Sequence, residues 1–217
     1  MGGGGDSEEQ TWLLYDYVLG LARGTRVLYV PTASRENPEL VVLFYERFRG
    51  RAETTALRFF PWPPERLREL VLAQDVIVVG GGNTANMLAI WRVHGFDRIV
   101  REAWEDGIVL CGASAGMICW FEAGVTDSFG PQLEGMRDGL GFLAGSACPH
   151  YDGEERRRPT YTKLVRDGFP PGYAADDGAA LHFAGTELAE VVTCRPGTAA
   201  YRVEPDGETR LETRLLA

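Results

Sequence analysis

The sequence predicts an α/β fold in which a mostly parallel sheet lies between helices, with an antiparallel β extension at the C-terminus. Short apolar runs alternate with segments of about 10–15 residues that carry apolar residues at helical spacing, which is typical of βαβ units. Beyond residue 170, short β-like runs are separated by Pro-Gly and Asp-Gly turns, which are typical of antiparallel hairpins. No linker or repeat interrupts the chain, so we expect one domain over residues 1–217.

The first half of the chain supplies the predicted βα alternation. Ser7 and Gln10 form a capping box that begins a helix through Ala22. The apolar run 26–30 predicts a buried strand, and Asn37-Pro38 predicts the start of the next helix. Further strands are expected at 52–60, 75–79 and 108–111, and helices at 64–73, 84–93 and 96–105.

The second half carries weaker signals. A short helix is expected to end near Trp120, and a loop around 148–152 precedes a charged helix. His182 lies in an expected strand, and the extension is predicted from strands at 191–194, 200–203 and 209–215.

Four consecutive glycines, Gly2–Gly5, precede the first helix without a strand before them. In open α/β sheets a glycine-rich turn normally follows a strand. Two interpretations stay open: a flexible tail, or a missing first strand with the translation start further upstream.

Composition excludes several classes of protein. The net charge of −9 and pI of about 4.9 argue against binding to nucleic acid. No apolar run approaches the ~18 residues of a membrane span, and the N-terminus lacks the pattern of a signal peptide. The four cysteines match neither a zinc spacing nor a disulfide framework. We therefore expect a cytoplasmic protein with reduced cysteines, no metal, no organic cofactor and no membrane partner.

The motif Gly112-Ala113-Ser114-Ala115-Gly116 follows the expected strand 108–111 and precedes a short helix. G-x-S-x-G between strand and helix is the sequence pattern of a nucleophile elbow, in which small neighbours permit a strained turn. Ser114 is therefore the candidate nucleophile. The amide of Ala115, at the helix start, is a candidate donor to an oxyanion.

A serine nucleophile needs a base, and the chain has only 3 histidines. His94 lies near a helix C-terminus, where a structural role explains it, and His182 lies in an expected strand. His150 lies in the Pro-constrained stretch Cys148–Asp152 and is the candidate base.

The acid that orients the base must fix its tautomer. Asp127 lies between Ser114 and His150 in the sequence and is favoured. The acidic residues that compete with it are Glu122, Glu134, Asp138 and Asp152.

A second glycine run, Gly80–Gly82, is followed by Asn83-Thr84 between an expected strand and helix. The run lacks the Lys-Ser/Thr of a P-loop and the G-x-G-x-x-G register, so a nucleotide site is disfavoured. Because the strands 75–79 and 108–111 are expected neighbours, the amides of this loop should face Ser114 as a second oxyanion donor.

The motifs GGGNT, GASAG and PHYD, in this order, resemble the peptidase E/cyanophycinase family of serine peptidases from about Val27 to Cys194. The resemblance implies a fold similar to the class I glutamine amidotransferases, which is a flavodoxin-like parallel α/β sandwich. It implies Ser114 as nucleophile, His150 as base, and backbone donors at Gly82 and Ala115. Peptidase E carries its acid at an interval similar to that of Asp127.

The resemblance also implies substrate contacts. Gly153–Arg156 resembles a segment whose Arg reads the side chain of an N-terminal Asp, which nominates Arg156. Asp176 or Asp177 resembles an acidic position that could bind a substrate α-amino group, and Asn83 is a further candidate contact. The chain departs from peptidase E at Ala113, where that enzyme has Trp, and in a shorter His-to-Arg interval. These departures reshape the expected pocket.

We therefore expect a serine peptidase of small peptides that prefers an N-terminal Asp, with a homodimer as a possible assembly. Cyanophycinase-like activity is disfavoured because the chain is short. Three alternatives stay open: an α/β-hydrolase esterase with His182 as base, a Cys111 nucleophile, and a non-catalytic domain that binds an acidic metabolite.

Overall fold

The computed structural model describes residues 1–217, which form two compact units. Residues 16–116 form the Ser114 unit, and residues 1–15 with 117–217 form the His150 unit. The prediction that the whole chain is one domain stays a prediction. No helix has the length and apolar character to cross a lipid bilayer.

The Ser114 unit contains a parallel sheet in the order β2-β1-β3-β4. Its strands are β1 (Arg26–Val30), β2 (Glu53–Ala56), β3 (Val76–Val79) and β4 (Val109–Gly112). β1 and β3 read as continuous apolar runs, and Leu28 and Ile77 are fully buried. Such runs are typical of parallel strands that helices cover.

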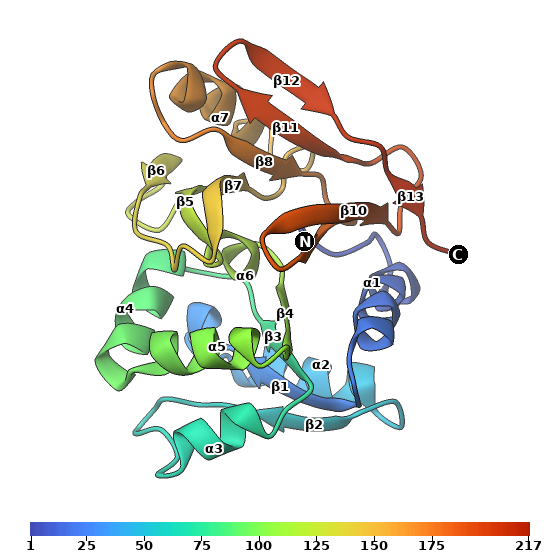
Figure 1. The fold of residues 1–217 in the computed structure, drawn as a ribbon, viewed down its shortest axis with the longest axis vertical. Helices are drawn as coiled ribbons and strands as arrows, with labels where there is room; N and C mark the ends of the chain where they lie inside the picture. The colour runs from blue at the N-terminus through green and yellow to red at the C-terminus, as the bar shows by residue number, and fades with distance from the viewer. The chain divides into compact units, whose positions relative to one another are not determined.

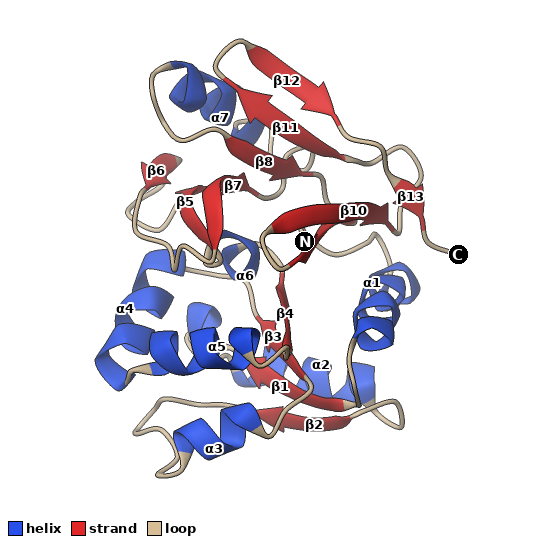
Figure 2. Ribbon diagram, viewed as in Figure 1, coloured by secondary structure: helices blue, strands red, loops and turns tan.

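The helices that follow the strands of this unit in the chain flank its sheet (Figure 2). They are the 3₁₀ helix η1 (Thr32–Ser34), α2 (Pro38–Phe48), α3 (Leu67–Leu72), α4 (Thr84–His94) and α5 (Phe96–Glu105). Two more helices, α1 (Glu8–Leu21) and α6 (Ala115–Ile118), each contain residues of both units. Asn37 caps α2 by accepting a hydrogen bond from Glu39 N at 2.8 Å. The Ser7–Gln10 box is also present, because Ser7 Oγ accepts from Gln10 N at 3.2 Å and Gln10 Oε1 accepts from Asp6 N at 2.8 Å.

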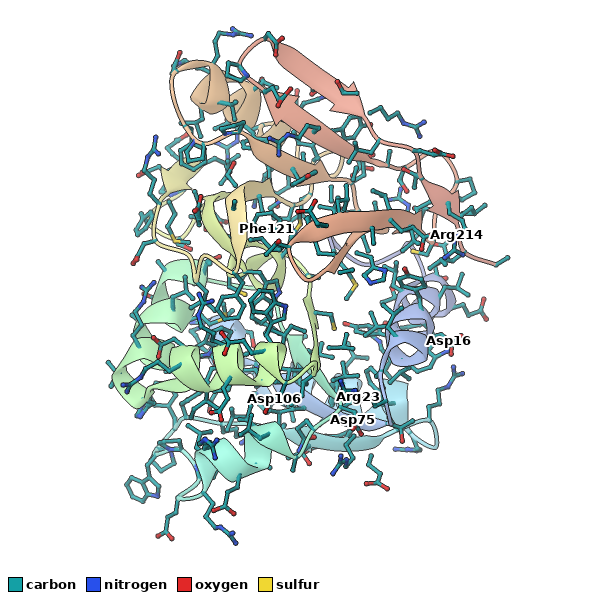
Figure 3. All side chains as sticks on the ribbon, in the orientation of Figure 1. Asp16, Arg23, Asp75, Asp106, Phe121 and Arg214 are labelled. Atoms are coloured by element: carbon teal, nitrogen blue, oxygen red, sulfur yellow. The ribbon has the colours of Figure 1, made fainter.

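Charged residues gather at the end of this sheet where its strands begin. Arg23, Asp75 and Asp106 lie near one another there (Figure 3). Asp75 Oδ2 accepts hydrogen bonds from the backbone N and the Nε of Arg26 at 3.0 and 3.1 Å. These bonds hold the pKa of the Asp75 carboxyl below its usual value. The opposite end, where the strands finish, carries the glycine-rich turns.

The His150 unit contains a six-stranded sheet in the order β12-β11-β8-β7-β5-β6 (Figure 1). Its strands are β5 (Phe121–Thr126), β6 (Glu134–Met136), β7 (Leu143–Cys148), β8 (Gly172–Ala175), β11 (Ala200–Glu204) and β12 (Gly207–Arg210). β5, β7 and β8 pair in parallel, whereas the outer pairings are antiparallel. Helix α7 (Arg157–Arg166) lies between β7 and β8 in the chain.

A smaller sheet has the order β13-β10-β9. Its strands are β9 (Ala179–Ala184), β10 (Glu187–Thr193) and β13 (Arg214–Leu215), and β9 pairs with β10 in antiparallel orientation. The ring of Phe121, labelled in Figure 3, packs edge-on against Phe183 of β9 at 5.8 Å. The predicted fold class is confirmed: a parallel sheet is flanked by helices, and antiparallel strands follow in the C-terminal part.

Two predictions of elements were incomplete. The expected strand 52–60 ends at Ala56, because the chain leaves the edge of the sheet ahead of the prolines that follow Phe60. Strands β5 to β8 were not predicted. Strands β7 and β8 are rich in Ala and Gly, which have low strand propensity, and in β5 the apolar pattern is interrupted at Glu122.

The N-terminal glycines are not a flexible tail. Gly2 and Gly3 are buried, and Gly2 N donates to Ala179 O at 2.9 Å. Gly3 forms a parallel bridge with Asp177. The flexible-tail interpretation is therefore wrong.

We predict that Gly116→Ala destabilises the fold by about 1–3 kcal/mol, because an added Cβ at Gly116 would overlap the main-chain oxygen of Val79. Gly20→Ala is the matched control: Gly20 lies in α1 with no atom near its missing Cβ, and the same change there should stabilise by about 0.5–1 kcal/mol. Urea unfolding of both variants measures the difference. Equal midpoints would show that the elbow tolerates a methyl group.

Candidate active site

Ser114 lies in the turn between β4 and α6. Its φ of 59° is in the left-handed region, where a non-glycine residue is strained by about 1–3 kcal/mol. The strand–turn–helix context and the strained backbone agree with the nucleophile elbow predicted from the motif. The side chain is half-buried.

The two glycines of the motif are required by close packing. A Cβ at Gly112 would lie 2.6 Å from Val79 O and 2.7 Å from Gly116 O. A Cβ at Gly116 would come 2.9 Å from the carbonyl carbon of Val79. Helix α6 therefore begins directly against β3, and this contact fixes the turn that carries Ser114.

The second glycine run lies beside Ser114. A Cβ at Gly81 would be 3.3 Å from Ser114 Cβ and 3.7 Å from its Oγ. Gly82 has a φ of 133°, and an added Cβ there would overlap the main chain of Ala33. This places the loop next to the hydroxyl, as expected from the order of β3 and β4. The roles of the Gly82 and Ala115 amides as oxyanion donors stay predictions.

Asn83 caps helix α4. Its side-chain oxygen accepts a hydrogen bond from Asn86 N at 2.8 Å. The capped helix start predicted from Asn83-Thr84 is therefore confirmed. A substrate contact by Asn83 stays a prediction.

His150 follows β7 and also has a positive φ, of 54°. Its Nδ1 lies 2.7 Å from Asp177 Oδ1, and both side chains are about one quarter exposed, at 23% and 28%. A carboxylate at this distance favours the tautomer with the proton on Nδ1. Nε2 is then the nitrogen that can accept a proton.

The assignment of Asp127 as the orienting acid needs correction, because Asp177 occupies the Nδ1 side of His150. Strand β7 pairs with β8 on one side and β5 on the other. Asp177 follows β8, and His150 is turned toward it. Asp127 follows β5 and lies exposed in a turn, where its carbonyl accepts from Gly130 N at 3.4 Å.

The competing acids have other partners or positions. Asp152 Oδ1 accepts from the backbone N of Asp177 at 2.7 Å, and Glu122 Oε2 accepts from Gly145 N at 2.9 Å. The sequence, through the resemblance, nominates Asp177 only for substrate binding. Its contact with His150 depends on strand β8, which the sequence did not reveal.

Arg156 is exposed at the start of α7. Its guanidinium donates to Gln132 Oε1 and Pro131 O, each at 3.4 Å. The next residue, Arg157, is buried, where it donates to Glu154 Oε2 at 2.7 Å and to Val125 O at 2.9 Å. Of these two neighbouring arginines, only Arg156 presents its charge to solvent.

Asp176, the other acidic candidate, is 3% exposed. Its Oδ2 accepts from Ala199 N at 2.9 Å, whereas Oδ1 has no hydrogen-bond partner. Burial raises the pKa of this carboxyl above its usual value.

The two other histidines and Cys111 have surroundings that explain them without a catalytic role. The His94 ring stacks on Phe59 at 5.3 Å, and His182 lies within β9, opposite Glu190 of β10. Burial within the sheet raises the pKa of the Cys111 thiol to about 12. No cluster of three or more His, Cys, Asp or Glu side chains has an arrangement that could hold a metal ion.

Comparisons with known proteins add independent information. The model of peptidase family S51 matches residues 1–191. A protein described as the uncharacterized peptidase YgaJ, from Bacillus subtilis (strain 168), is 49% identical over 208 residues, which are 94% of this chain and 90% of that protein.

Two solved structures share the fold. A peptidase from an acI-B1 Actinobacterium aligns with a TM-score of 0.64 and 19% identity, covering 97% of this chain and 92% of that one. A putative peptidase E protein from Listeria monocytogenes EGD-e aligns with a TM-score of 0.61 and 20% identity, covering 95% and 96%.

The raised pKa of Cys111 predicts an inert thiol. With a pKa of about 12, only about 10⁻⁴ of the thiol is ionised at pH 8, so alkylation should be about 10³-fold slower than for a free cysteine. Mass spectrometry after iodoacetamide treatment of the native and the urea-unfolded protein measures this. Rapid modification of native Cys111 would restore it as a candidate nucleophile.

Proposed function

The chain belongs to peptidase family S51, and from this premise we propose that it hydrolyses small peptides with Ser114 as nucleophile and His150 as base. Family membership makes the protein a hydrolase and a serine-type peptidase. The roles of single residues and the nature of the substrate are the proposal.

In the proposed reaction, Ser114 Oγ attacks the peptide carbonyl carbon while its proton passes to His150 Nε2. The amides of Ala115 and Gly82 stabilise the negative oxygen of the tetrahedral intermediate. The leaving amine takes the proton from His150. A water molecule then gives a proton to His150 Nε2 as it attacks the acyl-enzyme carbonyl carbon. When the bond to Ser114 Oγ breaks, His150 passes this proton to Oγ and the carboxylic acid product leaves.

The observation that carries this proposal is the 2.7 Å contact between His150 Nδ1 and Asp177 Oδ1. The carboxylate leaves Nε2 basic and stabilises the imidazolium that forms when the serine proton arrives. The strained backbone at Ser114 supports the proposal independently, because strain of this kind clusters at functional residues. We therefore assign the orienting role to Asp177 in place of Asp127.

We further propose that the substrate is a dipeptide or short peptide with an acidic first residue, and that Arg156 reads its carboxylate. Arg156 is exposed, and both of its hydrogen bonds are long, at 3.4 Å. The guanidinium can exchange them for a bidentate pair with a carboxylate at small cost.

The proposed triad predicts a ranked set of losses. Ser114→Ala and His150→Gln should lower kcat by about 10⁴-fold or more, and Asp177→Asn by roughly 10³–10⁴-fold. Asp127→Asn and His182→Gln are the matched controls and should stay within about two-fold of the unchanged protein. Dipeptide hydrolysis and labelling by a fluorophosphonate, which should vanish in Ser114→Ala, measure these effects. A loss confined to Asp127→Asn or His182→Gln would refute the assignment.

The proposed specificity is tested with Asp-Leu and Leu-Leu as paired substrates. Arg156→Ala should lower kcat/KM for Asp-Leu by roughly 10²-fold, because it removes a charge-assisted pair, and should leave Leu-Leu unchanged. Arg166→Ala, exposed at the other end of α7, is the control. Equal rates for the two substrates in the unchanged protein would exclude recognition of an acidic residue.

A further inference from the structure

We propose that the N-terminal segment 2–6, together with Arg195, positions the His150–Asp177 pair, so that Gly3 is a positioning residue for catalysis. The catalytic consequence rests on the proposed function. The positioning itself does not, because all the contacts that carry it lie within the His150 unit.

Gly3 lies against both members of the pair. A Cβ at Gly3 would overlap Asp177 Oδ1, and it would come 2.9 Å from Asp177 Cγ and 3.1 Å from His150 Cε1. The main chain of Gly3 also pairs with that of Asp177 as a parallel bridge, and its carbonyl accepts from Gly178 N at 3.4 Å. The main chain of Gly3 therefore lies directly against the His150 ring and the Asp177 carboxylate, and it limits the movement of both groups toward the N-terminal segment.

A second glycine closes the other side of the carboxylate. A Cβ at Gly153 would overlap Asp177 Oδ2 and lie 3.2 Å from its Cγ. The Asp177 carboxylate is thus held between two stretches of main chain that have no side chains. Rotation about its Cβ–Cγ bond is restricted from both sides, which keeps Oδ1 directed at His150 Nδ1.

The segment is anchored at both ends. Gly2 N donates to Ala179 O at 2.9 Å. At the other end, Asp6 Oδ2 pairs with Arg195 Nε at 3.0 Å. The anchors lie on either side of Gly3, so the backbone between them is held against the pair.

Arg195 links this anchor to Asp177 itself. Its Nη1 donates to the backbone oxygen of Asp177 at 3.1 Å and lies 3.8 Å from Asp152 Oδ2. Asp152 in turn accepts from Asp177 N. Both main-chain polar groups of Asp177 are therefore held by side chains, and one of these side chains also holds the N-terminal segment.

The physical consequence is positional accuracy. Misplacement of a catalytic group by about 1 Å can cost ~10²-fold in rate. A methyl group at Gly3 would displace the carboxylate by an amount of this order, since the space it needs is occupied by Asp177 Oδ1. We expect Gly3→Ala to lower kcat by roughly 10²-fold and to leave KM nearly unchanged, because Gly3 contacts the pair and not the proposed substrate reader.

The test combines kinetics with a readout that needs no activity. The Nδ1 proton of a histidine bound to a carboxylate gives a low-field ¹H NMR resonance, which His150→Gln assigns by removing it. Gly3→Ala should lose or shift this resonance and lower kcat, whereas Gly20→Ala should keep both. A Gly3→Ala protein with an unchanged resonance, or with kcat within two-fold of the unchanged protein, would overturn the proposal.

Two further measurements distinguish a failure of the positioning proposal from misfolding of Gly3→Ala and from a failure of the proposed function. If Gly3→Ala fails to fold, Arg195→Gln removes the anchor without adding an atom beside Asp177, and it should shift the resonance and lower kcat by about 10-fold. An unchanged resonance in Arg195→Gln would overturn the role of the anchor. If the unchanged protein cleaves no peptide, the proposed function fails, and the NMR comparison alone decides the positioning.

Discussion

Glycine main chain that lies closer to its neighbours than a Cβ would permit holds the candidate catalytic groups in both units. In the Ser114 unit, Gly116 lies directly against Val79, and this contact sets the turn that presents the hydroxyl. In the His150 unit, Gly3 and Gly153 enclose the carboxylate of Asp177. Glycine loses more conformational freedom on folding than any other residue, so these close contacts carry an entropy cost that the rest of the fold must offset.

The two residues proposed for proton transfer share a second property. Ser114 and His150 have φ values of 59° and 54°, which few non-glycine residues adopt. Glycine would relieve the strain at either position but would remove the reacting group. In the Ser114 unit, buried strands such as β1 and β3 contribute the stability that tolerates this cost at Ser114.

Local patterns predicted much of this molecule, because their causes are local. The apolar run 26–30 and the cap at Asn37 depend on neighbouring residues alone, and both are present in the structure. The Ser114 elbow was predictable for the same reason. The partner of His150 was not predictable, because it depends on which strand lies on which side of β7. The Ala- and Gly-rich sequence of β8 conceals the strand that Asp177 follows. Proximity in sequence favoured Asp127, whereas strand order favours Asp177.

The burial of Gly2 bears on how this protein is handled in the laboratory. The chain enters the fold at Gly2, where an added Cβ would lie 2.8 Å from the carbonyl carbon of Ala175, so there is little room for a bulkier residue. A bulky group introduced at Gly2 would therefore disturb the main chain that lies against His150 and Asp177. Ala217, by contrast, is exposed two residues beyond β13, where an added group meets no such restriction.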